Sequence, residues 1–188
     1  MKYAFAMFFI LAATALLQIA VLPSILPAVL LPDLMLLVGI TALAFAPREF
    51  ALVLLFLLGV QADLFGSAKF GLLTLCYLLA AGTMLWAAWR ELTTGDSLAA
   101  CIGCIAGTLL AHTLYVGIGR FCGVDLPWGQ GLAKVLSLVL ASIVWSLPVG
   151  FFFGGFMYRL GVVALPVREK WAAEARLKAA RRGKISRA

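Results

Sequence analysis

Charged residues are scarce in this chain, and their scarcity excludes an ordinary soluble fold. Asp, Glu, Lys and Arg make up only 12% of the 188 residues, whereas 64% are hydrophobic and the mean hydropathy is +1.09. A soluble domain of this size has no means of hiding so much apolar surface, so lipid must cover it. The apolar runs leave no stretch long enough for a soluble domain, and we expect no catalytic domain outside the membrane.

The residue sets that carry catalysis in other proteins are also missing. The chain has one histidine, and it has no HExxH motif, no Gly-rich phosphate loop, no paired aspartates and no Ser-His-Asp set. Cys101 and Cys104 have CxxC spacing, and His112 follows on the same run, but no second CxxC or HxxH motif completes a metal site. Cysteines in apolar runs behave as small hydrophobic residues. We therefore expect no enzyme activity and no metal or other cofactor.

Six apolar runs predict an all-α, polytopic transmembrane bundle of six helices within residues 1–165. About 20 apolar residues cross a bilayer, so the second and third runs are short for a full crossing. We interpret the first run as a retained helix, not a signal peptide, because no small-residue cleavage site follows it. The predicted spans are residues 3–22, 33–46, 50–65, 70–89, 98–119 and 135–158.

The basic residues predict the orientation and a surface tail. Twelve of the 15 Lys and Arg residues lie on the side of the two termini, so both termini are expected in the cytoplasm. Residues 166–188 hold eight Lys or Arg and two Glu, which predicts a helical tail on anionic lipid, or alternatively a docking site for a cytoplasmic partner. No nucleic-acid partner is expected. The predicted membrane-surface residues are Arg168, Lys170, Trp171, Arg176, Lys178, Arg181 and Arg182.

Three ionisable side chains stand inside or beside the apolar runs, where charge is costly and usually has a partner. Asp33 is expected to cap the second helix by accepting backbone N–H bonds. Asp63 either reaches the interface or holds Lys69 or a polar group of a neighbouring helix. His112 is expected to bond another helix through a Thr or Tyr.

Small residues spaced four apart predict close helix packing. One ladder lies on the fifth run and a shorter one on the sixth. The two interpretations are packing within the bundle and a docking face for the single helix of a partner. The residues are Ala99, Gly103, Gly107 and Ala111, followed by Gly150 and Gly154.

The first half of the chain resembles a known family. A Pro32-Asp33 start precedes an apolar helix, and Gly59, Asp63 and Gly71 follow in the segment Leu57–Tyr77. This pattern is similar to that of the rod shape-determining protein MreD family, from about Pro32 to Tyr77. In that family these positions look structural, not catalytic.

The resemblance implies a bacterial inner-membrane scaffold of the cell-elongation machinery. It implies direct binding to MreC, with RodA, the elongation transpeptidase and the MreB filament in the same assembly for lateral peptidoglycan synthesis. The family is also similar to S components of energy-coupling-factor transporters, so a vitamin-binding subunit is the alternative. Polar groups for such a pocket would come from Gln61, Asp63, His112, Tyr115, Arg120, Asp125 and Trp128. The AxxxA pattern of that class is absent from the first helix, and Ala42 and Ala46 are the nearest substitute.

Overall fold

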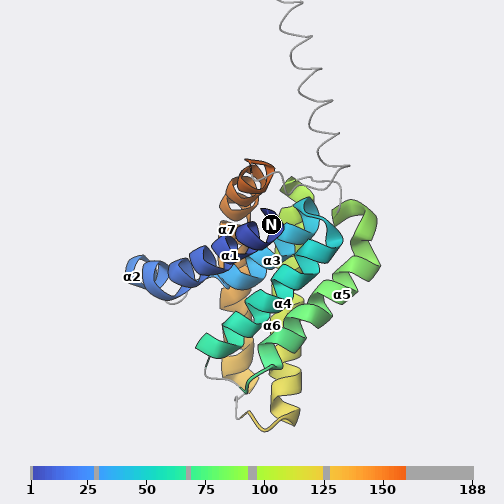
Figure 1. The fold of residues 1–188 in the computed structure, drawn as a ribbon. Coiled ribbons are helices and arrows are strands. Elements are labelled where there is room, and N and C mark those ends of the chain that lie inside the picture. Colours follow the sequence, from blue (N-terminus) through green and yellow to red (C-terminus); the bar gives the residue numbers. More distant parts are fainter. Residues whose placement is uncertain (1, 28–29, 67–68, 93–96, 125–127, 160–188) are drawn as a thin grey trace, which may run out of the picture.

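The computed structural model describes residues 2–27, 30–66, 69–92, 97–124 and 128–159, and the regular secondary structure of these residues is all helical. The first helix is continuous through three labelled pieces, so the described residues form six helices and no sheet (Figure 1). The elements are α1 (Lys2–Leu16), the π-helix η1 (Leu17–Val21), α2 (Leu22–Ile25), α3 (Leu34–Phe45), α4 (Arg48–Phe65), α5 (Leu72–Leu92), α6 (Ser97–Phe121) and α7 (Trp128–Arg159).

Helix α3 lies at the centre of the bundle. Every one of its 12 residues is buried, which fits a helix that is apolar on all sides. It packs against α4, α6 and α7, while α5 packs between α4 and α6. The core therefore forms around a helix too short to cross a membrane alone, since 12 residues span about 18 Å.

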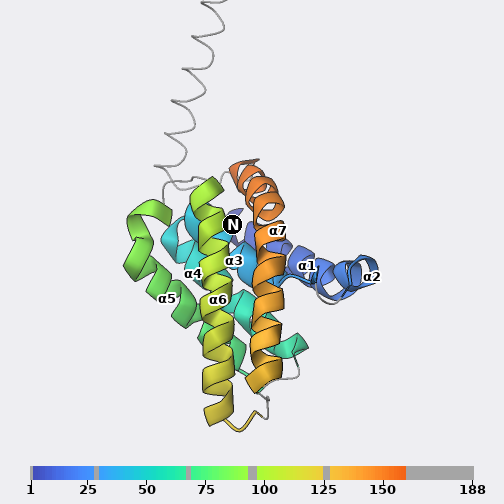
Figure 2. The same cartoon turned by 180° about the vertical axis from the view of Figure 1, so that it is seen from behind.

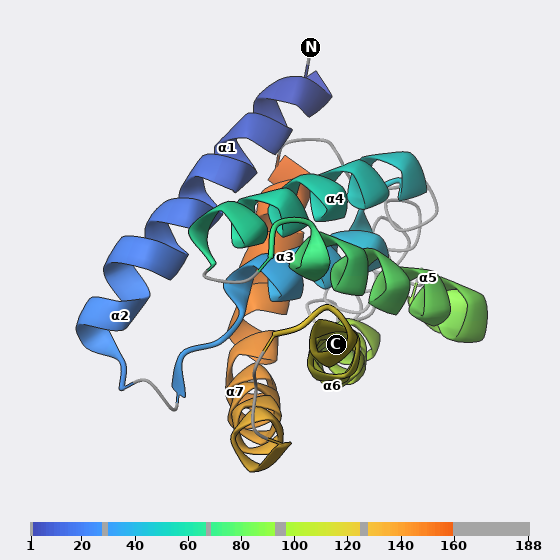
Figure 3. The same ribbon diagram turned by 90° about the horizontal axis from the view of Figure 1, so that it is seen from below.

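The two long helices α6 and α7 lie side by side along the length of the molecule (Figures 1 and 2). The segment α1–η1–α2 takes a different direction. Figure 3 views α6 end on, and in the same view α1 is seen along its length at one side of the bundle. Much of its surface is exposed, including Phe5, Phe8 and Ile25. This first helix is therefore an inclined arm on one side of the bundle.

Three helices are long and apolar enough to span a membrane: Tyr3–Ile25, Leu98–Phe121 and Gly131–Met157. The chain is therefore a multi-pass membrane protein by length and composition. Leu34–Phe45 and Leu72–Trp86 are shorter apolar helices, so six full crossings remain a prediction.

Two helices extend beyond the spans predicted for them. The first helix does not stop at Leu22 but continues through Pro23 to Ile25. Proline has no N–H to donate to the helical hydrogen-bond pattern. The π-helical turn η1 lies just before Pro23, and it changes that pattern at the place where a regular α-helix would need the missing N–H. The last helix begins at Trp128 instead of Val135, and it runs without interruption through Pro148.

Candidate functional site

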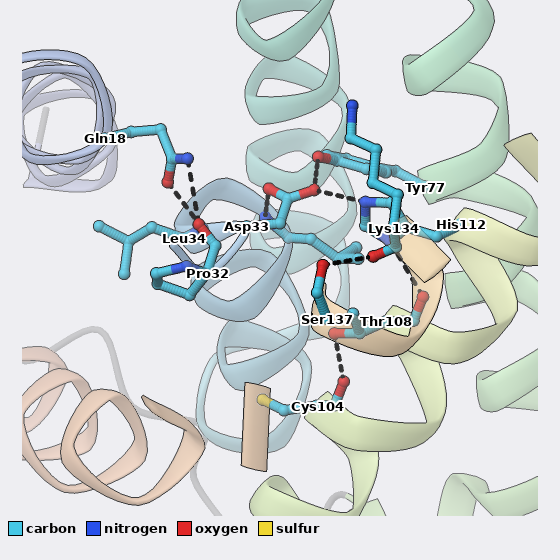
Figure 4. A network of polar contacts seen from close by, with 11 residues as sticks. Gln18, Pro32, Asp33, Leu34, Tyr77, Cys104, Thr108, His112, Lys134 and Ser137 are labelled. Atoms are coloured by element: carbon cyan, nitrogen blue, oxygen red, sulfur yellow. Dashed lines mark hydrogen bonds and ion pairs between the residues drawn. The ribbon is translucent and has the colours of Figure 1, made fainter. Parts of the chain in front are cut away.

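Asp33 is the point where three helices meet. Its Oδ1 accepts a hydrogen bond from the Leu36 amide at 3.2 Å, so it caps α3 as predicted. The cap is only part of its role, because Oδ2 accepts from the Tyr77 hydroxyl of α5 and lies 3.2 Å from Nε2 of His112 on α6 (Figure 4). We call Asp33, Tyr77 and His112 the polar cluster.

The two ring nitrogens of His112 face different partners. Its Nδ1 lies 3.0 Å from the carbonyl oxygen of Thr108, which can only accept, so Nδ1 carries a hydrogen. Its Nε2 faces Oδ2 of Asp33 at 3.2 Å, so the imidazole joins α6 to the start of α3. The predicted helix-to-helix bond of His112 therefore exists, but its partner is a carboxylate and not a Thr or Tyr.

A glutamine on the arm holds the start of α3. The Gln18 side chain, within η1, donates from Nε2 to the Pro32 carbonyl at 3.1 Å and accepts the Leu34 amide at 2.8 Å with Oε1. Both backbone groups belong to the turn that presents Asp33. The π-helical turn thus places one amide side chain where it satisfies two backbone groups at once.

The polar cluster lines a pocket of about 540 Å³, which we call the Asp33 pocket. It lies at the end of the bundle where α4 and α6 finish and α3, α5 and α7 begin, the end that Figure 3 faces. Asp33 and His112 expose only 14% and 10% of their side chains. The wider lining comes from every helix of the bundle and includes Gln18, Leu31, Met35, Phe65, Tyr115, Val116 and Lys134.

Only part of the predicted polar set reaches this pocket. His112 and Tyr115 line it, whereas Gln61, Asp63 and Arg120 are not in its lining. The Gln61 amide instead donates to the Leu11 carbonyl at 3.0 Å, and its buried Oε1 has no partner among the described residues. Asp125 and the Trp128 side chain lie outside the described part of the chain, and Ala42 and Ala46 are buried in or beside α3.

Asp63 holds α5 in place from the end of α4. Its Oδ1 accepts the Leu73 amide at 2.9 Å, and its Oδ2 accepts the Thr74 amide at 3.0 Å and the Thr74 hydroxyl. Of the partners predicted for Asp63, the structure shows the polar group of a neighbouring helix, which is Thr74 of α5. Lys69 donates to the Cys122 carbonyl instead. A carboxylate that is 4% exposed thus satisfies the first turn of the next helix.

The two glycines of this corner are required for different reasons. At Gly59 a Cβ atom would lie 2.8 Å from the Thr74 Cα, so only glycine lets α4 and α5 approach this closely. Gly71 has φ +91°, a left-handed conformation that starts the turn into α5. Gly59, Asp63 and Gly71 therefore form one α4–α5 corner, and none of the three lines the Asp33 pocket.

The small-residue ladder of α6 faces the bundle. Gly103, Gly107 and Ala111 are buried, Ala99 is half-buried, and a Cβ at Gly107 would lie 2.2 Å from Cδ1 of Ile40. Packing within the bundle accounts for these residues in the isolated chain, which does not offer them to a partner. On α7, Gly150 is buried, and the surroundings of Gly154 are outside the description.

The CxxC spacing has no metal-binding counterpart in the described residues. Cys104 Sγ lies 3.4 Å from the Thr41 hydroxyl of α3, inside the core, and His112 faces Asp33. The part of the chain that is described holds no group of three His, Cys, Asp or Glu side chains arranged for a metal. The predicted membrane-surface residues of 166–188 lie beyond the described residues.

Two residues of the site were missed in the sequence. Tyr77 lies 44 residues from Asp33, and Gln18 lies 14 and 16 residues from its two partners. A lone amide in an apolar run was the available signal for Gln18, because a polar side chain in a membrane helix usually has a partner. Tyr77 gave no such signal, since a tyrosine is ordinary in an apolar helix.

A second cavity lies on the side of the molecule, between the arm and α7. It has a volume of about 610 Å³, and we call it the α1–α7 groove. Phe9 of α1 stacks on Phe156 of α7 within it, with ring centroids 5.6 Å apart. Thr14 is the one polar side chain in its lining, and its hydroxyl donates to carbonyls of its own helix at Ile10 and Leu11.

Fold and site together define a multi-pass helical membrane protein with an Asp–Tyr–His cluster in the wall of a pocket of mixed polar and apolar lining. Searches of family models, curated proteins and solved structures give no match to this chain. Chemically, the cluster ties three helices together through contacts to one carboxylate.

Proposed function

We propose that this chain is an integral membrane scaffold of the bacterial cell-elongation machinery, a rod-shape-determining protein of the MreD type. It would lie in the inner membrane with both termini in the cytoplasm and help to organise lateral peptidoglycan synthesis. Support comes from the motif residues, which act at helix junctions. Pro32 and Asp33 set the start of α3, and Gly59, Asp63 and Gly71 set the α4–α5 corner.

The observation that carries the proposal is the α1–α7 groove. Its lining is apolar except for Thr14, whose hydroxyl is already satisfied, and it lies between two helices long enough to span a membrane. Helix association within lipid depends on close packing, so a preformed apolar groove suits the single helix of a bitopic protein. MreC is such a protein and is the direct partner we propose, with RodA, its transpeptidase and MreB in the same assembly.

Site-specific crosslinking tests this placement. A photoreactive amino acid replaces Phe152, which is 74% exposed and lines the groove. The matched control replaces Phe56 of α4, which is 45% exposed and lies outside the groove lining. We expect a crosslink to MreC from position 152 and none from position 56. Equal crosslinking from both positions would exclude the groove as the interface.

The Asp33 pocket favours a second candidate function, a substrate-binding S component of an energy-coupling-factor-type transporter. Ligand pockets typically enclose about 300–1,000 Å³ and hold a few convergent polar groups, which describes this one. Such a subunit would co-purify with paired ATPases and a coupling membrane protein. A scaffold would co-purify with MreC instead.

A further inference from the structure

The charges around the Asp33 pocket are unequally matched. The Asp33 carboxylate already accepts from the Leu36 amide and the Tyr77 hydroxyl, and it lies 3.2 Å from Nε2 of His112. The other buried carboxylate at this end, Asp63, is taken up by the first turn of α5. Both acidic groups are therefore already hydrogen-bonded to partners within the protein.

The one cationic side chain in the pocket lining has no such match. Lys134 extends from the first turns of α7 beside the polar cluster (Figure 4). Among the described residues no carboxylate lies within ion-pair distance of its ammonium group. The Ser137 hydroxyl donates to the Lys134 carbonyl, so it contacts the backbone of this residue and not its charge. The unmatched charge of the pocket is thus positive.

The remaining lining offers hydrogen-bond donors above an apolar wall. Gln18 uses one of its two N–H donors on Pro32, and Tyr115 lines the pocket with its ring half-buried. Leu31, Met35 and Phe65 supply apolar surface beside them. A cation, a few neutral donors and an apolar wall suit a molecule with an anionic group on an apolar or neutral body.

We propose that the Asp33 pocket binds a molecule carrying a phosphate or carboxylate group, which pairs with Lys134 above the polar cluster. The anion belongs either to a free small molecule or to a lipid headgroup, because the pocket lies at the end of the bundle beside Ile19 of the exposed arm. This inference holds for a scaffold and for a transport subunit alike.

Binding measurements on the purified full-length protein test the proposal and separate the two sources. Glycerol 3-phosphate, titrated by calorimetry in neutral detergent, is the free anion. Native mass spectrometry from nanodiscs of phosphatidylcholine with one-tenth phosphatidylglycerol measures the lipid. We expect Lys134→Gln to weaken binding of whichever probe binds the unaltered protein by at least about tenfold, since a charge-assisted hydrogen bond is lost. Lys134→Arg, which keeps the charge, should bind within about threefold of the unaltered protein.

Lys69→Gln is the matched control, because Lys69 lies at the same end of the bundle but outside the pocket lining. Lys134-dependent binding of glycerol 3-phosphate supports a free ligand, and Lys134-dependent retention of phosphatidylglycerol alone supports a headgroup. Equal losses in the Lys69 and Lys134 variants would overturn the proposal, as they would indicate general surface attraction. Failure of both probes to bind the unaltered protein would overturn it too, without bearing on co-purification with MreC.

Discussion

At the scale of single residues, Asp33 joins more elements than any other polar side chain described here. One oxygen caps α3, and the other meets a hydroxyl from α5 and an imidazole from α6. Between membrane helices such bonds typically contribute about 0.6–2 kcal/mol each. A pair whose partners are both buried should therefore respond to replacement as one unit.

A double-mutant cycle tests this coupling. Asp33→Asn keeps a good cap for α3 but loses the charge that His112 meets, and His112→Phe removes the other partner. We expect each single variant to lower the free energy of unfolding by about 1–3 kcal/mol. The double variant should lose about 1 kcal/mol less than the sum, measured by circular dichroism in mixed detergent micelles. Losses that simply add would show that the two side chains act independently.

Asp63 is expected to be a structural cap, with a cost that depends on its acceptor oxygens. Asp63→Leu leaves the Leu73 and Thr74 amides of α5 without acceptors and should lower the free energy of unfolding by about 2 kcal/mol. Asp63→Asn keeps one carbonyl oxygen and should cost less. Glu49→Gln, which replaces an exposed acidic residue of α4, is the control. It should change the free energy of unfolding by under about 0.5 kcal/mol. An Asp63→Leu variant with the same free energy of unfolding as the unaltered protein would contradict a capping role for Asp63.

At the scale of elements, the α4–α5 corner depends on a close approach of the two backbones. Gly59→Ala places a methyl group against the Thr74 Cα and should lower the free energy of unfolding by about 1–3 kcal/mol. Gly82→Ala on α5 is the matched control, because nothing lies within 4 Å of its Cβ position. The free energy of unfolding of that control should rise by about 0.5–1 kcal/mol, because alanine has a higher helix propensity than glycine. Equal changes at both positions would mean that the close approach has no energetic effect.

The arm is attached to the core at the start of α3 through Gln18. Gln18→Leu removes both of its hydrogen bonds, so the amide of Leu34 loses its acceptor. We expect its hydrogen exchange to accelerate by about tenfold, which corresponds to about 1.4 kcal/mol of local stability. Exchange in α6 should not change. Ser24→Ala, which removes an exposed bond on α2, is the control. Unchanged exchange at Leu34 in the glutamine variant would show that other contacts hold this turn.

At the scale of the whole molecule, the hydrophobic pattern sufficed for the helical class and for six helices, because apolar runs of this length have few other outcomes. Asp33 as a cap was also predictable, since Pro-Asp before an apolar run is a local signal. The direction of α1 and the continuation of the first helix past Pro23 were not predictable. They depend on a π-helical turn and on packing against α3 and α4. Tyr77 and His112 meet Asp33 only through the tertiary arrangement, which no spacing in the sequence encodes.

Co-purification tests our proposal that this chain joins the cell-elongation assembly as a non-enzymatic subunit. The tagged full-length protein is extracted from its native membranes in mild detergent, and the co-purifying proteins are identified by mass spectrometry. A tagged polytopic protein of unrelated function, extracted in parallel, sets the background. The account predicts enrichment of MreC together with RodA or its transpeptidase. Enrichment of paired ATPases with a coupling membrane protein, and no MreC, would contradict it and establish the transporter alternative.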